Sequence, residues 1–337
     1  MSSTASPSAP THRRIALVLA NPAVSTTTGW PVGFWWSELT HPWLAFADAG
    51  YEVVLFSPDG GRIEADAMSD PDDASGYSRH DLISRGFLHT PELRALLDAT
   101  GRVADIDVDA FDAILVAGGQ SPMFSFEAAT GLHAKFGAFH DAGKVAAALC
   151  HGTAILRYAR GADGELIAKG RTVTGFANVE EDAADQAVWD AGLLPRDRHV
   201  MPWRIEDALR GIGANYLQAG AWRSFAVRDG NLITGQQNFS GDRLAPSPPP
   251  VARPGDAAGR GVAACGPGRF LARRGTRRRA ARVPAPALGG VPERRLPPFP
   301  LRTRPRLGAA PSAAADALPA LVTPALVTLL PQHGLPP

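Results

Sequence analysis

One cysteine stands where the chain changes from an apolar strand to a helix. Lys144 to Leu156 reads K-V-A-A-A-L-C-H-G-T-A-I-L, so Cys150 ends an apolar run and begins a helical run that contains a glycine. A thiol at a helix N-terminus lies against unpaired N–H groups and the positive end of the helix dipole, which lowers its pKa. We therefore predict a nucleophile on a strand-to-helix elbow. The alternative is a buried structural cysteine, the commoner role of a lone Cys.

Two further side chains near this elbow could move protons. His151 follows the cysteine directly, and the sequence leaves open whether its ring lies beside the thiol as a base or points away. Glu38 lies in F-W-W-S-E-L-T-H-P among aromatic and apolar residues, so burial should raise its pKa and keep part of it protonated near neutral pH. A protonated carboxyl can donate a hydrogen bond to the cysteine sulfur. The alternative is an exposed helix glutamate.

A pair of glycines, Gly118 and Gly119, follows the apolar run at 112–117. Without side chains there, a backbone N–H can turn toward a reacting carbonyl, and the amides of Gly119 and His151 would form an oxyanion hole. A G-G pair alone also occurs in ordinary strand-ending turns. Gln120 comes next, and its amide can donate and accept hydrogen bonds but cannot exchange protons near neutral pH.

Strands and helices alternate around these residues. Continuous apolar runs are typical of parallel strands covered on both faces. They predict strands at Ile15–Ala20, Tyr51–Ser57, Asp112–Ala117 and Val145–Leu149. Shorter strands are predicted at Arg171–Thr174, Asn215–Ala219, Trp222–Val227 and Leu232–Thr234, the last two joined by the hairpin signal Asp229-Gly230. Helices are predicted at Gly33–Ala49, Pro91–Ala99 with Thr90 as cap, Met123–Ala142, Asn178–Ala191 and Arg204–Gly211.

This alternation predicts a doubly wound α/β fold, a mostly parallel sheet sandwiched by helices, of the flavodoxin-like kind. Ligands of such sheets bind at the carboxyl ends of strands, where Ser57, Gly118 and Cys150 fall. No metal-ligand spacing such as H-x-x-x-H or C-x-x-C exists, so neither a metal nor another cofactor is expected. Trp30, Trp35 and Trp36 are interpreted as core or pocket-lining residues.

Several sequence blocks together resemble the ThiJ/PfpI (DJ-one) superfamily of the class I glutamine amidotransferase-like fold, and most of all its heat-shock-protein, glyoxalase III branch. They are G-W-P-V-G-F-W-W-S-E-L-T-H-P, A-G-Y-E-V-V-L-F-S-P-D-G-G, D-A-I-L-V-A-G-G-Q, A-L-C-H-G-T-A and G-R-T-V-T-G-F-A-N-V-E-E, followed by L-I-T-G-Q-Q-N-F-S-G. The resemblance implies that Cys150, His151 and Glu181 form a catalytic set, with Glu180 as the alternative acid, and that Glu38 is a general acid/base. The chain departs from its relatives at Gln120, where they usually read G-G-H-G.

The resemblance also implies the reaction. We expect a cofactor-independent enzyme similar to glyoxalase III, which converts methylglyoxal and water to lactate, with possible deglycase activity and a homodimeric assembly. Two alternatives remain open: an amidase or peptidase-like hydrolase that uses the same thiolate, and a stress chaperone or redox sensor in which Cys150 is oxidised. The expected partner is a small carbonyl compound, with no membrane.

Composition divides the chain into two parts. Residues 243–337 hold 15 arginines, no lysine, three acidic residues and 19 of the 30 prolines. This composition predicts a disordered tail after a catalytic domain at 14–242, with a further disordered stretch at 1–13. The basic run R-R-G-T-R-R-R could bind nucleic acid, but a tail without lysine favours a shifted reading frame in a GC-rich gene. With no secretory signal, and with Cys150 and Cys265 in dissimilar segments, a cytoplasmic location is expected.

Overall fold

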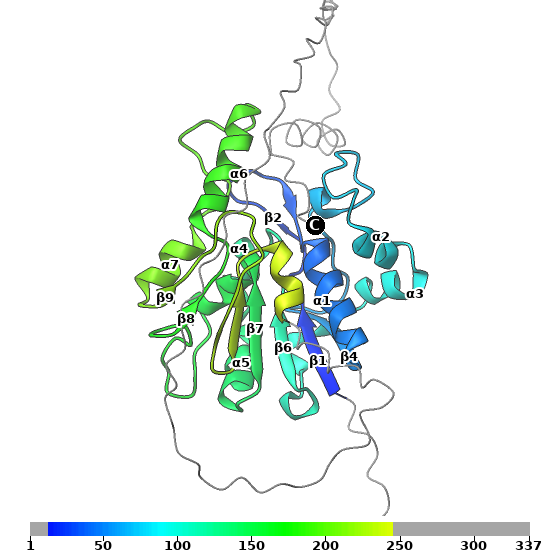
Figure 1. Ribbon diagram of the computed structural model, residues 1–337, viewed down its shortest axis with the longest axis vertical. Coiled ribbons are helices and arrows are strands. Elements are labelled where there is room, and N and C mark those ends of the chain that lie inside the picture. The colour runs from blue at the N-terminus through cyan, green and yellow to red at the C-terminus, as the bar shows by residue number, and fades with distance from the viewer. Residues whose placement is uncertain (1–12, 245–337) are drawn as a thin grey trace, which may run out of the picture. The chain divides into compact units, whose positions relative to one another are not determined.

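A computed structural model describes residues 13–244 of the chain, and our interpretations of the N-terminal stretch and of the basic tail lie outside these residues. A seven-stranded sheet in the order β10-β11-β7-β6-β1-β4-β5 forms the centre. Its strands are β1 (Arg13–Val18), β4 (Tyr51–Ser57), β5 (Gly101–Arg102), β6 (Ala113–Val116), β7 (Val145–Leu149), β10 (Ala226–Asp229) and β11 (Leu232–Gly235). Neighbouring strands pair in parallel except at the β10–β11 hairpin. The mostly parallel α/β fold predicted from the sequence is confirmed (Figure 1).

Helices connect the strands. They are α1 (Trp36–Asp48), α2 (Leu82–Leu88), α3 (Pro91–Arg94), α4 (Pro122–Ser125), α5 (Thr130–Asp141), α6 (Asn178–Asp190) and α7 (Ile205–Gly211). The step from β1 through α1 to β4 runs along the sheet in the opposite direction to the step from β6 through α5 to β7. Because such crossovers are right-handed, α1 and α5 cover opposite faces of the sheet. No helix within residues 13–244 has the length and apolar character needed to cross a bilayer.

Short 3₁₀ helices and small sheets complete the described chain. The 3₁₀ helices are η1 (Ala67–Ser69), η2 (Ala95–Leu97), η3 (Val103–Asp105), η4 (Val108–Ala110), η5 (Phe126–Ala128), η6 (Cys150–Arg157) and η7 (Asn238–Leu244). Strand β2 (Ala23–Val24) pairs with β3 (Pro31–Val32), and β8 (Thr172–Val173) pairs with β9 (Asn215–Tyr216). The η7 turn, yellow in Figure 1, packs against α1.

The central strands bury their apolar runs completely. Leu17, Val116 and Ala148 have no exposed surface, because helices cover both faces of the sheet. The strand register pairs Val18 with Val116 and Val116 with Ala148. The carboxyl ends of β1, β6 and β7 therefore meet at one edge. This edge places the loop after β6 beside Cys150 after β7.

Several local predictions are wrong. Thr90 precedes α3 but does not cap it, because its hydroxyl donates to the Gly86 carbonyl instead. The predicted helix over 123–142 breaks at Ala129, whose ψ of 58° is not helical, so α4 and η5 precede α5. The run after Cys150 is a 3₁₀ helix rather than an α-helix. Residues 62–90 contain α2, which the sequence analysis did not predict.

Candidate active site

Cys150 occupies a strained turn between β7 and η6. Its φ of 55° lies in the left-handed region, which a non-glycine residue adopts only where the surrounding structure holds it. The Thr153 hydroxyl donates to the Cys150 carbonyl at 2.6 Å and fixes this turn. Gly152 permits the turn to approach the end of β6, because a Cβ there would lie 2.5 Å from the Val116 carbonyl oxygen. The elbow predicted from the sequence is present.

His151 lies beside the thiol. Its Nδ1 is 3.7 Å from the Cys150 Sγ, and its Nε2 is 3.0 Å from Glu181 Oε1. The imidazole also stacks on Phe176, with ring centroids 4.1 Å apart. Although burial opposes the charged imidazolium, the facing Glu181 carboxylate raises the His151 pKa above its ordinary value. The ring is therefore held between sulfur and carboxylate in an orientation that suits proton transfer.

The two adjacent glutamates of α6 have different surroundings. Glu181 faces His151, whereas Glu180 accepts hydrogen bonds from the Ala177 and Trp222 amides and from the Gln236 side chain. Successive residues of a helix lie about 100° apart around its axis, so only one of the two can face the imidazole. The acid that contacts His151 is Glu181, and Glu180 instead fastens the start of α6 to the loop that carries Trp222.

Glu38 reaches the same sulfur from the first turn of α1. It is fully buried, its Oε2 accepts the Gly118 N–H at 2.6 Å, and its carboxyl lies beside the Cys150 thiol, with Oε1 free of any hydrogen-bond partner among the described residues. Burial raises the pKa of Glu38 from 4.5 to about 8, as the apolar neighbours in the sequence predict. The carboxyl is therefore mostly protonated at neutral pH. It can donate to sulfur or to a substrate oxygen.

The prediction of a low thiol pKa is wrong for this structure. Burial raises the pKa of the Cys150 thiol well above its ordinary value, and the neighbouring Glu38 adds to the effect. The backbone N–H of His151 lowers the thiol pKa, but this effect is outweighed by burial and by Glu38. Only 4% of Cys150 is exposed. The thiolate must therefore form by proton transfer to a neighbouring base.

The loop after β6 keeps one amide available. The Gly118 N–H is used by Glu38 and the Gln120 N–H by Asp66, but the Gly119 N–H has no acceptor among the described residues. Gly119 has a φ of 103°, and a Cβ there would lie 2.4 Å from the Gly33 carbonyl oxygen. Gly119 and the neighbouring Gln120 line the cavity at Cys150. Gly118 thus positions Glu38, and the open oxyanion donor of this loop is Gly119.

Asp66 is a site residue that the sequence analysis missed. Only 3% of it is exposed, and its two carboxylate oxygens accept the Gly33 N–H at 2.8 Å and the Gln120 N–H at 2.7 Å. Burial raises the pKa of Asp66 to about 7. It ties the segment before α1 to the Gly119 loop. Its apolar neighbours in I-E-A-D-A-M resemble those of Glu38 and were the available signal.

A narrow cavity of about 100 Å³ opens over the sulfur and is lined mainly by aromatic and aliphatic side chains. It contains the predicted residues Glu38, Gly119, Gln120, Cys150, His151 and Glu181. Trp30 and Trp35 also line it, whereas Trp36 is buried in the core. We call this cavity the thiol pocket. It brings together every predicted site residue except Gly118 and Glu180, which lie behind its wall.

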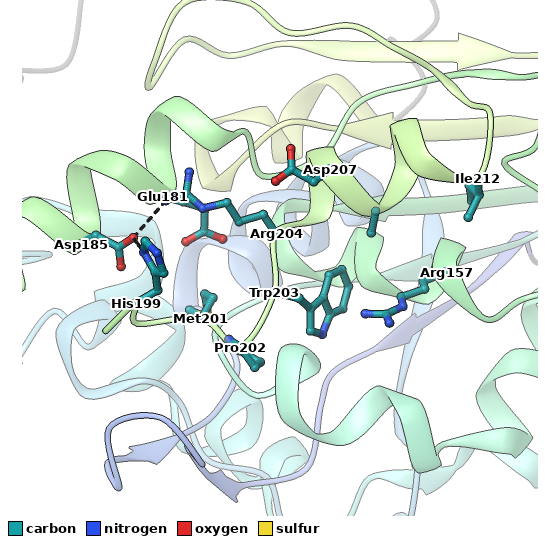
Figure 2. A pocket seen from close by; sticks show the side chains of 11 residues that line it. Arg157, Glu181, Asp185, His199, Met201, Pro202, Trp203, Arg204, Asp207 and Ile212 are labelled. Carbon is teal, nitrogen blue, oxygen red and sulfur yellow. Dashed lines mark hydrogen bonds and ion pairs between the residues drawn. The ribbon is translucent and has the colours of Figure 1, made fainter. Parts of the chain in front are cut away.

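A wider groove of about 710 Å³ lies on the other side of Glu181. Figure 2 shows its side chains, with Asp185 beside His199 and Arg204. Asp185 accepts from His199 Nδ1 at 2.6 Å, from Arg204 Nη2 at 3.1 Å and from the Val200 amide at 2.7 Å. Glu181 and Met201 line both the groove and the thiol pocket. The charged groups around Asp185 are therefore engaged with one another.

An open, mostly parallel sheet with a buried Cys–His–Glu set on a strained elbow defines an α/β protein with this set at the carboxyl edge of its sheet. Residues 32–190 match the sequence model of the DJ-1/PfpI family. The chain belongs to this family.

The chain is similar to named relatives and to solved structures. The chain is 26% identical over 236 residues to the probable glutathione-independent glyoxalase hsp3103 of Schizosaccharomyces pombe, which covers 63% of this chain and 87% of the relative. The crystal structure of glyoxalase III from Candida albicans has a TM-score of 0.56 and 26% identity, covering 69% of this chain and 94% of that one. Rapid Encystment Protein 24 KDa of Francisella tularensis has a TM-score of 0.60 and 28% identity, covering 69% and 96%.

Proposed function

We propose that the protein is a glutathione-independent glyoxalase that converts methylglyoxal and water to lactate. One observation carries the proposal: the Glu38 carboxyl and the His151 imidazole both lie beside the same buried sulfur, so an acid and a base are within reach of a carbonyl held there. The names of the relatives from Schizosaccharomyces pombe and Candida albicans support it. A reducing compartment such as the cytoplasm would suit the free thiol.

The first step forms a bond between sulfur and the aldehyde carbon. As Sγ attacks, its proton passes to His151, whose pKa is raised by Glu181 and which is therefore a stronger base. Glu38, protonated at neutral pH, gives its proton to the aldehyde oxygen, and the amides of Gly119 and His151 stabilise the negative charge that develops there. The product is a neutral hemithioacetal.

The second step is an internal redox exchange that needs no external oxidant. The Glu38 carboxylate removes the hydrogen from the former aldehyde carbon, and the imidazolium protonates the neighbouring ketone oxygen, which gives an enediol. Glu38 returns its proton to the second carbon, while the hydroxyl on the first carbon loses its proton to His151. The first carbon is thereby oxidised to a thioester and the second reduced to an alcohol, and water then cleaves the thioester to lactate and the thiol.

The volume of the thiol pocket favours this reaction over hydrolysis of an amide or a peptide. A volume of about 100 Å³ suits a small carbonyl compound, whereas pockets for larger ligands usually measure about 300 Å³ or more. A peptide backbone would need an extended cleft that reaches the sulfur. The wide groove stops at Glu181 and does not include Cys150.

Turnover of methylglyoxal by the purified full chain tests the proposal. Lactate should form without glutathione, and Cys150→Ala should abolish its formation while the fold stays intact. Cys265→Ala is the matched control, because it removes the other cysteine and should leave the rate unchanged. Equal rates in wild type and Cys150→Ala, or no lactate from the wild type, would refute the proposed reaction.

A further inference from the structure

The walls of the thiol pocket are aromatic on two sides. Trp35 packs edge-on against Tyr77, with ring centroids 6.1 Å apart, and Phe176 packs against Trp222 with centroids 6.0 Å apart. All four line the cavity together with Trp30. Because Phe176 also stacks on His151, one of these walls begins directly beside the reacting sulfur. A substituent attached to the reacting carbonyl must therefore lie among aromatic rings.

The volume of the pocket exceeds what methylglyoxal needs. At roughly 10–15 Å³ for each water-sized group, about 100 Å³ accepts on the order of seven to ten such groups. Methylglyoxal has five heavy atoms and phenylglyoxal has ten. Unused apolar space around a bound ligand forfeits contacts that a larger substituent would make. The pocket thus has space for a branched alkyl group where methylglyoxal carries a methyl group, and at the upper limit of this range for a phenyl group.

Among the described residues, the pocket offers no lysine or arginine to an anionic substituent. Its described lining contains two carboxyl side chains, Glu38 and Glu181, and neither lysine nor arginine. Asp66 lies just behind this wall and contributes a further acidic group. A carboxylate or phosphate on the substituent would enter an apolar space without a lysine or arginine to pair with, which is costly. A neutral substituent meets no such cost.

We propose that the preferred substrates are neutral 2-oxoaldehydes with a bulky apolar substituent, such as arylglyoxals, which the aromatic walls of the thiol pocket hold beside Cys150. This inference rests on the proposed glyoxalase reaction. Phenylglyoxal and water would give mandelate by the same sequence of proton transfers. Since one added methylene in an apolar pocket is worth about tenfold or more in specificity, kcat/KM for phenylglyoxal should exceed that for methylglyoxal by at least roughly tenfold.

Competition between substrates on the wild-type full chain is the first test. A higher kcat/KM for phenylglyoxal supports the inference, and an equal or lower value overturns it while leaving the glyoxalase proposal intact. Turnover of neither compound would instead refute the glyoxalase reaction itself. The pair 4,5-dioxopentanamide and 4,5-dioxopentanoate, which have nine heavy atoms each and differ in charge, should differ at least roughly tenfold in favour of the neutral amide. Equal rates would contradict the preference for neutral substrates.

Variants locate the preference in the pocket. Tyr77→Ala removes one aromatic wall and should raise KM for phenylglyoxal about tenfold with little change for methylglyoxal. Ala184→Leu adds bulk to the lining without removing a wall, and should exclude phenylglyoxal selectively even if Tyr77→Ala fails to fold. Trp203→Ala is the matched control, since this aromatic residue lines only the wide groove. If Trp203→Ala changed the substrate ratio and Ala184→Leu did not, the preference would lie outside the thiol pocket.

Discussion

The thiol pocket and the wide groove meet at Glu181 but differ in how their polar groups are used. In the groove, Arg204 is paired with Asp182 at 2.6 Å and with Asp185 at 3.1 Å, and His199 also faces Asp185. In the pocket, Oε1 of Gln120 has no hydrogen-bond partner among the described residues, and the Gly119 amide likewise has none. The charged groups around Asp185 in the wide groove are therefore paired with one another. The thiol pocket instead contains polar groups that a bound ligand could pair with.

This difference indicates where chemistry can occur. Buried polar groups are normally paired, because leaving one unpaired costs about 1–3 kcal/mol. A protein tolerates this cost at a binding site, because a bound substrate supplies the missing hydrogen-bond partner. The groove is about seven times as large, at about 710 Å³ against about 100 Å³, yet its described lining contains no cysteine, serine or threonine. Unpaired groups beside a nucleophile locate the reaction better than volume does.

After the loss of turnover in Cys150→Ala, the largest effect is expected at Glu38. Glu38→Gln keeps the size of the side chain but removes its exchangeable proton, so kcat should fall by roughly 10²–10⁴-fold. Methylglyoxal kinetics on the purified variant measure this loss. A rate close to that of the wild type would show that the carboxyl only supports the Gly118 loop.

The same variant should be more stable than the wild type at high pH. The Glu38 pKa rises from 4.5 to about 8 on folding, so between these pH values the unfolded chain releases a proton that the folded chain keeps. The free energy of unfolding therefore falls as pH rises through this range, by on the order of a few kcal/mol. Urea unfolding at pH 5 and pH 8 should show a smaller decrease for Glu38→Gln. Parallel pH dependences would mean that Glu38 is not protonated in the folded state.

Substitutions of the two adjacent glutamates of α6 should have different effects, one mainly on kcat and the other mainly on the free energy of unfolding. Glu181→Gln loses the carboxylate that holds His151 and raises its pKa, so kcat should fall roughly 10–100-fold with stability little changed. In Glu180→Gln one of the two oxygens that together accept three N–H groups becomes an NH₂ group, so the free energy of unfolding should fall by about 1–3 kcal/mol with a smaller change in kcat. If Glu180→Gln instead lowered kcat and Glu181→Gln lowered stability, the catalytic contact would belong to Glu180.

Asp66 should have a smaller effect, which depends on pH. In Asp66→Asn one carboxylate oxygen becomes an NH₂ group that cannot accept the Gly33 or Gln120 N–H, so the Gly119 amide loses its fixed orientation. We expect kcat to fall about tenfold with KM nearly unchanged, and the ionisation near pH 7 to disappear from the rate profile. An unaltered pH profile would leave Asp66 with a purely structural role.

The groove should be nearly insensitive to substitution. The Arg157 guanidinium lies over the Trp203 ring, with its Cζ 4.6 Å from the ring centroid, and the side chain is exposed. It makes no side-chain hydrogen bond within the described residues. Arg157→Ala should change kcat/KM less than twofold and the free energy of unfolding by about 0.5 kcal/mol or less. A large loss of turnover in this variant would make the groove part of the reaction site.

The sequence predicted those features that depend on neighbouring residues. The bounds of β4 and β7 agree with the predicted strands, because continuous apolar runs end there at turn residues. The elbow at Cys150 and the helix that carries Glu181 were placed in the same way. The choice between Glu180 and Glu181 needed the orientation of α6, which depends on distant contacts such as Gln236.

The failed predictions depend on packing between distant segments. The thiol pKa was predicted from the helix dipole, a local property, but residues far apart in sequence bury the sulfur and place Glu38 beside it. Asp66 is buried only because the loops at Gly33 and Gln120 converge on it. A local pattern cannot reveal such convergence.

A covalent intermediate on Cys150 is the central claim, and rapid acid quenching during methylglyoxal turnover tests it most directly. Low pH preserves thioesters, so digestion and mass spectrometry should identify a lactoyl group on the peptide that contains Cys150. The amount should increase in Glu181→Gln if cleavage of the thioester slows more than its formation. Lactate production by the wild type with Cys150 unmodified throughout, or with the lactoyl group on another residue, would contradict the account.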